Sequence, residues 1–543
     1  MQALLGARID RLPEGLRSRL QTAAVIGLEF EPALLASLAG ADVDDDVAAL
    51  EELGFLHHRG DDVAFCHSLV QEVAYRGQLE SHRRAVHARL AELLEARHGG
   101  IDAAPQEISL RIAHHWQQAA QWARAGSWNL VAARWAMSQS MAVTYDQYRR
   151  ALANYDRTAD SPEVHRGRIA ARAAMIRMAQ FATISEEEVD RLYAEGRAMA
   201  EACGDVACEA ELRMSYGNDL MRRAQVDAAA AAHEEAVQLC FAHGRRELVN
   251  RFRLAILITH NAAGRLRRAL EILDAAGGDW RTRPIDDDNY ASRGFYGLML
   301  SWLGRLDEAA QHVDEAIAHV ERSGHLVGWI YGNRVDLAFL SGDFAPALPV
   351  ATRALELAEK MDSPFFRAIA LRAYGLALSL NGRSEEAIDA LREAQPMVAR
   401  GAPAHQFEAH LFSTQALALL GAQREAEAEA AARAARASAH GAGSRIWEIA
   451  AWLAWLRLPA TAERRAEAQS GIARVDELIA FTGAEGFRPW LHLARAHWST
   501  EAEQRECSRA LAQAAFTAIG ARAYAQRLAE RRAQEVPTMR QSA

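Results

Sequence analysis

The sequence predicts an all-α protein that is built mainly as a solenoid of two-helix repeats. Residues recur with a period of about 40 through most of the chain, and the strong helix formers Ala, Leu, Arg and Glu dominate, with only 13 prolines among 543 residues. A fixed period of this length is the signature of a stacked repeat array. The recurring alanines are Ala229, Ala269, Ala309, Ala347, Ala387, Ala426 and Ala466. Five residues before them lie the expected turns at Ala224, Gly264, Gly304, Gly342, Gly382, Gly421 and Thr461.

Small residues within a repeat predict where its two helices cross. One repeat carries Gly297, Gly304, Ala309 and Ala316, and their spacing of 7, 5 and 7 residues recurs from residues 217 and 375. A small side chain lets two helix axes approach to about 8–10 Å. The middle glycine suits the end of the first helix, where a left-handed residue is needed. We therefore predict a repeat array over residues 184–530.

The residues before the array have a different sequence pattern, in which helical segments are combined with short strands. Helical periodicity covers residues 15–26, 32–39 and 43–53, and two short strands are expected around 54–58 and 63–66 with a polar turn between them. A helix beginning near Ser68 completes a winged-helix domain over residues 1–78. Residues 79–183 are expected to form a helical connector and the first hairpins, with breaks at 98–100 and near 125–126. Residues 531–543 lack periodicity and are predicted to be a disordered tail.

Composition narrows the function classes. The net charge is −9, so there is no overall electrostatic attraction to nucleic acid or an anionic membrane. No stretch of 18 apolar residues is present, and the first residues lack the apolar run of a secretion signal. The five cysteines have no metal-ligand spacing, and their odd number argues against a disulfide framework. We expect a cytoplasmic protein with reduced thiols.

The chain carries a single lysine, Lys360, among its 62 basic residues, and no glycine-rich loop precedes it. A phosphate-binding P-loop requires glycines followed by Lys and Ser or Thr, so this chain cannot contain one. No Ser–His–Asp set or carboxylate pair can be recognised either. We therefore expect no catalytic residue, no cofactor and no enzymatic activity.

Two further site types are disfavoured by the residues that would form them. The helix at 43–53, which would enter a DNA groove, carries five acidic residues and no basic one, so phosphate contact is not expected. The adjacent pairs His57–His58 and His114–His115 do not have the spacing of a zinc site. Adjacent histidines on a helix point about 100° apart, whereas zinc favours i, i+4 spacing. We predict that His67 and His115 serve in capping or packing, and we expect no metal site.

The glycine and small-residue spacings resemble the tetratricopeptide repeat family from about residue 184 to 500. This resemblance implies a right-handed helical solenoid, here with repeats of about 40 residues where the family usually has 34. The family's early tryptophan position holds Arg213, Arg253 and Arg293 instead. The first helix of each hairpin is expected to line a concave face.

The amino-terminal part resembles another family. The segments LLGARIDRLPEGLRSRL and DDDVAALEELGFLHHRGDDVAFCHSLVQEVAYRG, together with RIAHHWQQAAQWARAGSWNLVAARWA, resemble the region after the ATPase core of bacterial STAND-type signalling proteins. That group includes LuxR-type regulators and the ATPases associated with adenylate or guanylate cyclases. The resemblance covers about residues 2–140. It implies a preceding ATPase domain, of which Leu4–Leu12 resembles the closing segment.

The concave face is the candidate site, because aromatic, methionine and amide side chains suit a peptide or protein bound in a groove. If the repeat register holds, positions six, three and two residues before each turn face this groove. The candidate partner-binding residues are Asn218, Met221, Arg222, Asn261, Trp302, Trp329, Asp336, Arg372 and Gln415.

These observations favour a non-catalytic interaction and sensor module, the regulatory arm of a STAND-type signal-transduction ATPase that lacks its P-loop domain. The expected partners are a protein or peptide in the groove and an ATPase or cyclase module. Neither direct nucleic-acid binding nor membrane binding is expected. The alternatives are a freestanding tetratricopeptide scaffold and a fragment of a nucleotide-cyclase or LuxR-type regulator polypeptide.

Overall fold

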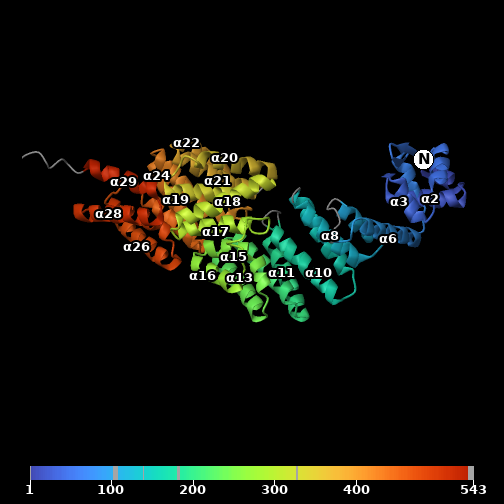
Figure 1. Cartoon of the computed structure of the whole chain (residues 1–543), viewed down its shortest axis with the longest axis horizontal. Helices are drawn as coiled ribbons and strands as arrows, with labels where there is room; N and C mark the ends of the chain where they lie inside the picture. The colour runs from blue at the N-terminus through green and yellow to red at the C-terminus, as the bar shows by residue number, and fades with distance from the viewer. Residues whose placement is uncertain (1, 102–107, 138–139, 180–183, 326–327, 536–543) are drawn as a thin grey trace, which may run out of the picture. The chain divides into compact units, whose positions relative to one another are not determined.

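A computed structural model describes residues 2–101, 108–137, 140–179, 184–325 and 328–535, with only the backbone described for 531–535. The chain forms two compact units, Met1–Met175 and Ile176–Ala543, which are described separately (Figure 1). Within the described ranges, no helix combines the length and the apolar character that a membrane span needs.

The first unit begins with helices packed around a small antiparallel sheet. The strands lie in the order β1-β3-β2, with Phe30 and His58 both opposite Val63. Gly60, between β2 and β3, has a φ of 67°, a left-handed conformation that suits glycine. The predicted helices and hairpin are confirmed, while the short strand β1 was not predicted. The elements are α1 (Gln2–Asp10), α2 (Glu14–Ile26), β1 (Glu29–Phe30), α3 (Pro32–Ala39), α4 (Asp44–Glu52), β2 (Leu56–Arg59), β3 (Asp62–Phe65) and α5 (Ser68–Arg76).

Five longer helices follow, and one of the two predicted breaks between them is wrong. Helix α6 ends at Arg97, as the glycines at 99 and 100 indicate, but residues 125 and 126 lie inside α8. The turn before α8 is at Ala120, with a φ of 58°. Gly126 instead permits close helix packing, because a Cβ there would lie 2.9 Å from the Tyr155 ring. The helices are α6 (Glu80–Arg97), α7 (Ser109–Gln118), α8 (Trp122–Ala136), α9 (Met141–Asp156) and α10 (Pro162–Met178).

Two of the connector's tryptophans belong to the core of the first unit. Trp116 and Trp128 are buried, and both indole N–H groups donate to the Glu95 carboxylate. One continuous hydrophobic cluster includes these rings and the core of the first 78 residues. Both tryptophans therefore pack in the core of the first unit.

The second unit is a stack of helical hairpins, which confirms the predicted all-α solenoid. Helix α29 extends to Glu535, so the predicted tail is wrong for residues 531–535, and residues 536–543 lie outside the described part. The helices are α11 (Glu186–Cys203), α12 (Val206–Arg222), α13 (Val226–Ala242), α14 (Arg246–Arg251), α15 (Arg253–Ala262), α16 (Leu266–Ala276), α17 (Tyr290–Trp302), α18 (Leu306–Ser323), α19 (Trp329–Ser341), α20 (Ala347–Met361), α21 (Pro364–Leu380), α22 (Ser384–Val398), η2 (His405–Phe407), α23 (Glu408–Gly421), α24 (Glu425–Ala442), α25 (Arg445–Trp455), α26 (Arg465–Thr482), η3 (Glu485–Phe487), α27 (Arg488–Trp498), α28 (Ala502–Ile519) and α29 (Arg522–Glu535).

The helices of a hairpin cross where the sequence places its small residues. A Cβ on Gly297 would lie 2.7 Å from Val313 Cγ2, and a Cβ on Gly375 would lie 2.6 Å from Leu391 Cγ. Both distances are too short for carbon atoms that are not bonded to each other. Ala309, the marker of the facing helix, is completely buried. These crossings therefore require the small residues at these positions.

The predicted repeat register places each recurring alanine in the buried crossing of its hairpin. It holds for the first five of these alanines and is wrong by two residues in the repeats that follow. Ala426 is exposed, whereas Ala428 is buried. The left-handed turn residue is Gln423, with a φ of 59°, and not Gly421. Gly421 is small for another reason, since a Cβ there would lie 2.4 Å from Ser384 Oγ in the preceding repeat.

The same two-residue shift affects the next repeat. Ala466 is exposed and Ala468 is buried. The connection between α25 and α26 runs from Leu456 to Arg464, which is longer than the other hairpin turns. Because the connection is longer, the second helix begins later in the sequence. The predicted alanine, Ala466, therefore lies on the solvent side of this helix.

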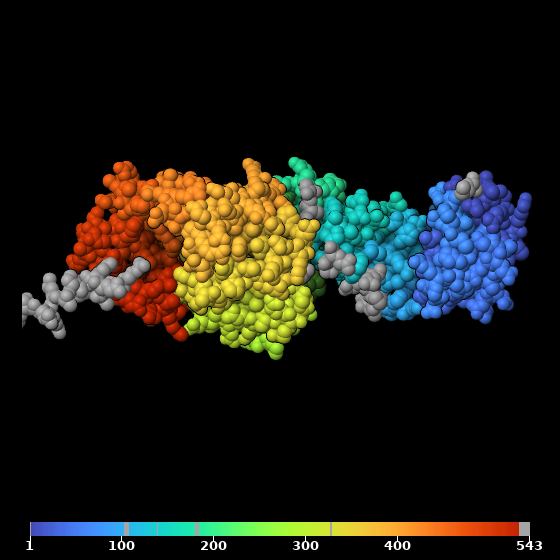
Figure 2. Space-filling model, turned by 90° about the horizontal axis from the view of Figure 1, so that it is seen from above, coloured from blue at the N-terminus to red at the C-terminus, as the bar shows by residue number. Residues whose placement is uncertain are grey.

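The second unit is wound so tightly that its last hairpins pack against its first ones. Helices α25 and α15 are in contact, as are α29 and α19. Figures 1 and 2 show the orange segments of the array lying beside the yellow ones. Arg445 Nη1 lies 2.9 Å from Asp227 Oδ1, and the Tyr524 hydroxyl donates to the Phe339 carbonyl over 3.1 Å. We call these contacts the closure. The closure turns the predicted concave face into an interior lumen lined by the first helices of the hairpins.

Candidate functional site

The lumen contains three neighbouring cavities. The amide cavity, named for Asn218, Asn261 and Gln406 in its wall, has a volume of about 380 Å³. The central cavity holds about 50 Å³, and the arginine cavity, named for Arg457, about 580 Å³. Adjacent cavities share walls. The amide and central cavities share Asp336, His410 and Trp447, and the central and arginine cavities share Phe339, Leu376, Leu417 and Arg457.

One position of the repeat supplies a residue to the lumen in every hairpin from α12 to α25. It lies eleven residues before the buried alanine of the second helix, as Arg457 does before Ala468. The equivalent residues all line at least one of the three cavities, so the repeat periodicity generates the site. They are Asn218, Ile258, Leu298, Asp336, Leu376, Leu417 and Arg457.

The wall of the amide cavity is largely apolar and includes several aromatic rings, with two polar atoms that have no partner among the described residues. Phe295, Trp329 and Phe366 are among its walls. Asn261 Oδ1 and Gln406 Oε1 are buried and accept no hydrogen bond from the described residues. A buried acceptor left without a donor costs about 1–3 kcal/mol. This cavity therefore favours a ligand that brings hydrogen-bond donors on an apolar body.

The central cavity is organised by a buried ion pair. Arg372 donates from both terminal nitrogens to Asp336, at 2.5 Å to Oδ1 and 3.0 Å to Oδ2. The His410 ring stacks on Trp447 at 3.6 Å, and its Nε2 lies 3.7 Å from Asp336 Oδ1. All of these side chains come from the inner faces of first helices.

The charges in this cluster follow from burial and from the neighbouring groups. Burial raises the pKa of Asp336, but the Arg372 guanidinium and His410 outweigh that effect and leave the pKa below its ordinary value. Burial, and then the charge on Arg372, lowers the pKa of His410 to about 4. At neutral pH the carboxylate is therefore charged and the imidazole neutral.

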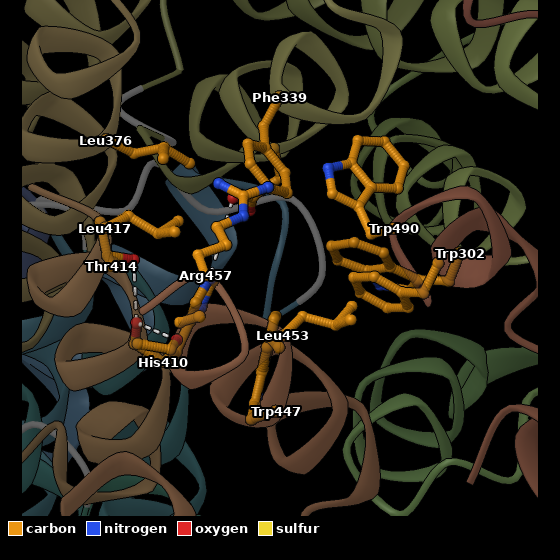
Figure 3. Close-up of a pocket in the computed structure, with 15 residues that line it drawn as sticks. Trp302, Phe339, Leu376, His410, Thr414, Leu417, Trp447, Leu453, Arg457 and Trp490 are labelled. Atoms are coloured by element: carbon orange, nitrogen blue, oxygen red, sulfur yellow. Dashed lines mark hydrogen bonds and ion pairs between the residues drawn. The ribbon is translucent and has the colours of Figure 1, made fainter. Parts of the chain in front are cut away.

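Arg457 is the second arginine of the lumen, and it has no acidic partner. Its guanidinium carbon lies 5.5 Å from the centre of the Phe339 ring, and no carboxylate of the described residues lies within ion-pair distance of it. Figure 3 shows its side chain reaching between Phe339 on one side and Leu376 and Leu417 on the other. Its side chain is exposed to the solvent space of the cavity, although desolvation by the surrounding atoms lowers its pKa. An anionic ligand group that entered the cavity would find this cation unpaired.

Six of the nine predicted partner-binding residues line the amide cavity, and the structure brings them together from α12, α15, α19 and α21. They are Asn218, Met221, Asn261, Trp329, Asp336 and Arg372. Their role in binding a partner stays a prediction.

Trp302 lies in a different environment from the one predicted for it. Its ring stacks on Phe487 at 5.1 Å and meets Trp447 edge to face at 5.8 Å. Only 3% of the residue is exposed. Because Phe487 belongs to a late hairpin, Trp302 is part of the closure, and it reaches the lumen only at the central cavity.

Arg222 and Gln415 do not line the lumen cavities. Arg222 is buried and donates from Nε to Asp219 Oδ1 over 2.8 Å on its own helix. Gln415 accepts a hydrogen bond from Gln395 over 3.0 Å. Gln415 was predicted to face the groove because the register was wrong by two residues in this repeat. Leu417 occupies the position that faces the lumen.

Sequence reasoning missed Arg457, His410 and Trp447. Counting back from Ala468 rather than Ala466 would have identified Arg457, because the same offset leads to Asp336 in an earlier repeat. His410 lies eighteen residues before Ala428, as the predicted Trp329 does before Ala347, so the corrected register leads to it as well. Trp447 lies twenty-one residues before Ala468, as Phe407 of the same cavity does before Ala428.

The predicted roles of two histidines are confirmed. His67 caps helix α5, because its Nδ1 accepts a hydrogen bond from the Leu69 backbone N–H over 3.1 Å. His115 is buried, and its Nδ1 lies 2.9 Å from Nδ1 of His87. Burial, and then the neighbouring histidines, lowers the pKa of His115 to about 3.

Comparison with known proteins identifies the type of repeat. A model of the tetratricopeptide repeat family matches residues 290–360, which comprise α17 to α20. The array is thus an all-α, right-handed solenoid of tetratricopeptide-like hairpins, and such repeats provide surfaces for protein contacts. A comparison with curated proteins found no significant match.

Several solved structures are similar in fold. A Rap protein complexed with competence and sporulation factor is 14% identical, with a TM-score of 0.43 over 60% of this chain and 93% of that chain. A signal transduction ATPase with numerous domains and a tetratricopeptide repeat sensor, from Pyrococcus horikoshii, is 13% identical, with a TM-score of 0.29 over 97% of this chain and 65% of that chain. Yeast Tom70 is 12% identical, with a TM-score of 0.32 over 83% of this chain and 100% of that chain.

Proposed function

We propose that the chain is a non-catalytic sensor whose effector binds inside the lumen of the repeat array. The observation that carries this proposal is Arg457, a solvent-exposed arginine in the wall of the arginine cavity, with Phe339 beside it and no acidic partner among the described residues. A guanidinium that forms no ion pair within the protein is available to a ligand, and a ligand that brings an anionic group would pair with it.

The effector is a short peptide that bears a carboxylate. Cavities of about 380 and 580 Å³ accommodate a few residues of extended chain and not a folded domain. Backbone N–H groups of the peptide would satisfy Asn261 and Gln406 in the amide cavity. Its carboxylate would pair with Arg457, and its apolar side chains would pack on the aromatic walls.

The finer proposal is that this sensor is the regulatory arm of a STAND-type ATPase. The resemblance of residues 2–140 to the region after the ATPase core in such proteins supports it. The order of α2, α3 and α4 followed by the β2–β3 hairpin supports a winged-helix module at residues 1–78. Peptide binding would bias the contact between arm and ATPase, and a differential affinity of about 1–3 kcal/mol between two states is sufficient for such coupling.

The winged-helix module is proposed to contact protein and not DNA. Helix α4 begins with Asp44, Asp45 and Asp46, and Arg19 pairs with Asp46 over 3.0 Å. Carboxylates at this position repel phosphate. We expect no retention of the full chain on a duplex DNA column at physiological salt, and retention that falls steeply with salt would contradict the assignment.

The lumen proposal is tested by thermal denaturation with a panel of apolar tetrapeptides, each prepared with a free carboxylate and as the amide. We expect some acids to raise the Tm of the wild-type chain by several degrees and the matched amides to have little effect. Arg457→Gln should lose this response. Arg322→Gln, which changes an exposed arginine of α18, should keep it. Equal responses of Arg457→Gln and wild type would refute the assignment of Arg457.

The partner proposal needs a separate experiment. The full chain, immobilised and exposed to extract of its native cell, should retain a P-loop ATPase or a cyclase-linked ATPase identified by mass spectrometry. Addition of an active peptide should change the amount retained. Retention of other proteins without any ATPase would favour the freestanding scaffold.

A further inference from the structure

A second group of ligand-bearing side chains lies outside the lumen. Asp287 Oδ1 is 2.9 Å from Nε2 of His319 and 2.9 Å from Nε2 of His325. The aspartate lies in the loop before α17, His319 is near the end of α18, and His325 follows that helix. None of the three lines a lumen cavity. Three separate segments thus direct one donor atom each towards a common point.

The two imidazole rings are held in place by an aromatic neighbour. Tyr290, the first residue of α17, stacks on His319 at 5.3 Å with an interplanar angle of 27°. The same ring stacks on His325 at 5.1 Å and 7°. Both rings are therefore oriented before any ligand binds.

The backbone on either side of Asp287 is held by its two neighbours in the sequence, whose side chains are already engaged. Asp286 accepts the backbone N–H groups of Asp288 and Asn289 over 3.1 and 3.0 Å. Asp288 forms an ion pair with Arg253 over 2.8 Å. Of the three consecutive aspartates, Asp287 alone faces the histidines, and their hydrogen bonds help to hold its pKa below the ordinary value.

We propose that Asp287, His319 and His325 bind a zinc ion, with a fourth position left for water or a group of a partner protein. Imidazole nitrogen and carboxylate oxygen are established zinc ligands, with bonds of about 2.0–2.2 Å. The three donor atoms lie within 4.8 Å of one another. A tetrahedral ion needs donor atoms about 3.3 Å apart, so the Asp–His distances would open by a few tenths of an ångström. Mg²⁺ and Ca²⁺ prefer all-oxygen sites and fit less well.

The zinc ion would tie the loop before α17 to the end of α18. A metal that binds the folded chain more tightly than the unfolded one raises Tm in proportion to its occupancy. The site is independent of the effector proposed for the lumen, and it adds a divalent cation to the ligands of this chain.

The test is isothermal titration of the metal-stripped full chain with zinc chloride, in competition with a chromophoric chelator. We expect one tight site, at least about tenfold weaker in Asp287→Asn and in His319→Gln. His243→Gln, which removes an exposed histidine elsewhere, should bind as the wild type does. Magnesium chloride should give no binding, and circular dichroism should show that all variants are folded.

X-ray absorption at the zinc edge supplies a second readout. Nitrogen and oxygen ligands, with imidazole scattering from two histidines, support the site. Sulfur ligands would place the ion on one of the five cysteines and overturn the site. Unchanged affinity and stoichiometry in both Asp287→Asn and His319→Gln would overturn it as well.

Discussion

The two arginines of the lumen have opposite environments. Arg372 meets the Asp336 carboxylate with two hydrogen bonds and is buried. Arg457 has Phe339 against its guanidinium and the aliphatic Leu376 and Leu417 nearby. The repeat explains the difference, because Asp336, Leu376, Leu417 and Arg457 occupy equivalent positions of successive hairpins. An acid lies within reach of Arg372 and apolar residues lie within reach of Arg457. The charge of Arg372 is thus neutralised by Asp336, whereas the charge of Arg457 has no acidic partner among the described residues.

Breaking the Arg372 pair should have the largest effect on stability. Asp336→Ala leaves the Arg372 guanidinium buried without its partner, which costs about 3–5 kcal/mol in comparable cases. Urea denaturation of the full chain should show this loss. The double variant Asp336→Leu with Arg372→Met should recover much of it, because apolar residues replace both charges. A single variant as stable as the wild type would mean that Arg372 is not dependent on Asp336.

The closure around both arginines should depend strongly on Trp302. Trp302→Ala removes a buried ring stacked on Phe487, and such truncations cost about 3–5 kcal/mol. The matched control is Trp329→Ala, since Trp329 is half-buried in the wall of the amide cavity and should cost less. Limited proteolysis should cleave Trp302→Ala faster within residues 445–535. Equal melting of Trp302→Ala and wild type would instead support the binding role predicted from sequence.

The paired end of the lumen should also be sensitive to acid through His410. Its pKa is lowered to about 4 in the fold, while the unfolded chain binds a proton at the ordinary value of about 6.5. The contribution of this neutral histidine to stability is therefore complete above pH 6.5 and is lost progressively between 6.5 and 4, by about 3 kcal/mol. Asp336 stays ionised over this range, because its pKa is held below the ordinary value.

His410→Gln provides the comparison for this pH dependence. Urea denaturation at pH 7 and at pH 4.5 should show a smaller loss of stability for the variant than for the wild type. Buried histidines elsewhere, such as His233 with a pKa of about 3, titrate in both proteins and cancel in the difference. Parallel pH profiles would contradict the assignment to His410.

The sequence predicted the hairpins, their crossings and six residues of the amide cavity, because these features repeat locally. The closure could not be predicted in this way, since Arg445 and Asp227 are more than 200 residues apart and no periodicity links them. The register failed where Gly421 was assigned to a turn. That glycine serves close packing on Ser384, and the non-glycine residue Gln423 takes the left-handed conformation. The same two-residue error is the reason why Arg457 was not predicted to line the lumen.

The corrected register places Ala428, and not Ala426, in the buried crossing of its hairpin. The equivalence of Asp336 and Arg457 depends on this register, and substitutions at the two alanines test it. Ala428→Trp should overpack the hairpin crossing and cost about 1–3 kcal/mol or more. Ala426→Trp changes an exposed position of the same helix and should be almost neutral. Thermal denaturation of the two variants decides between the registers, because the uncorrected register predicts the opposite order.

Replacing Arg457 should have the smallest effect on stability. Arg457→Met keeps a long side chain against Phe339 and removes a charge that no acidic residue offsets, so the free energy of unfolding should stay within about 1 kcal/mol of the wild type or increase. The response to carboxylate peptides should disappear in the same variant. A destabilisation as large as that of Asp336→Ala would show that Arg457 is a structural cation like Arg372. Unchanged stability with loss of the peptide response would show instead that the array holds this charge for its ligand.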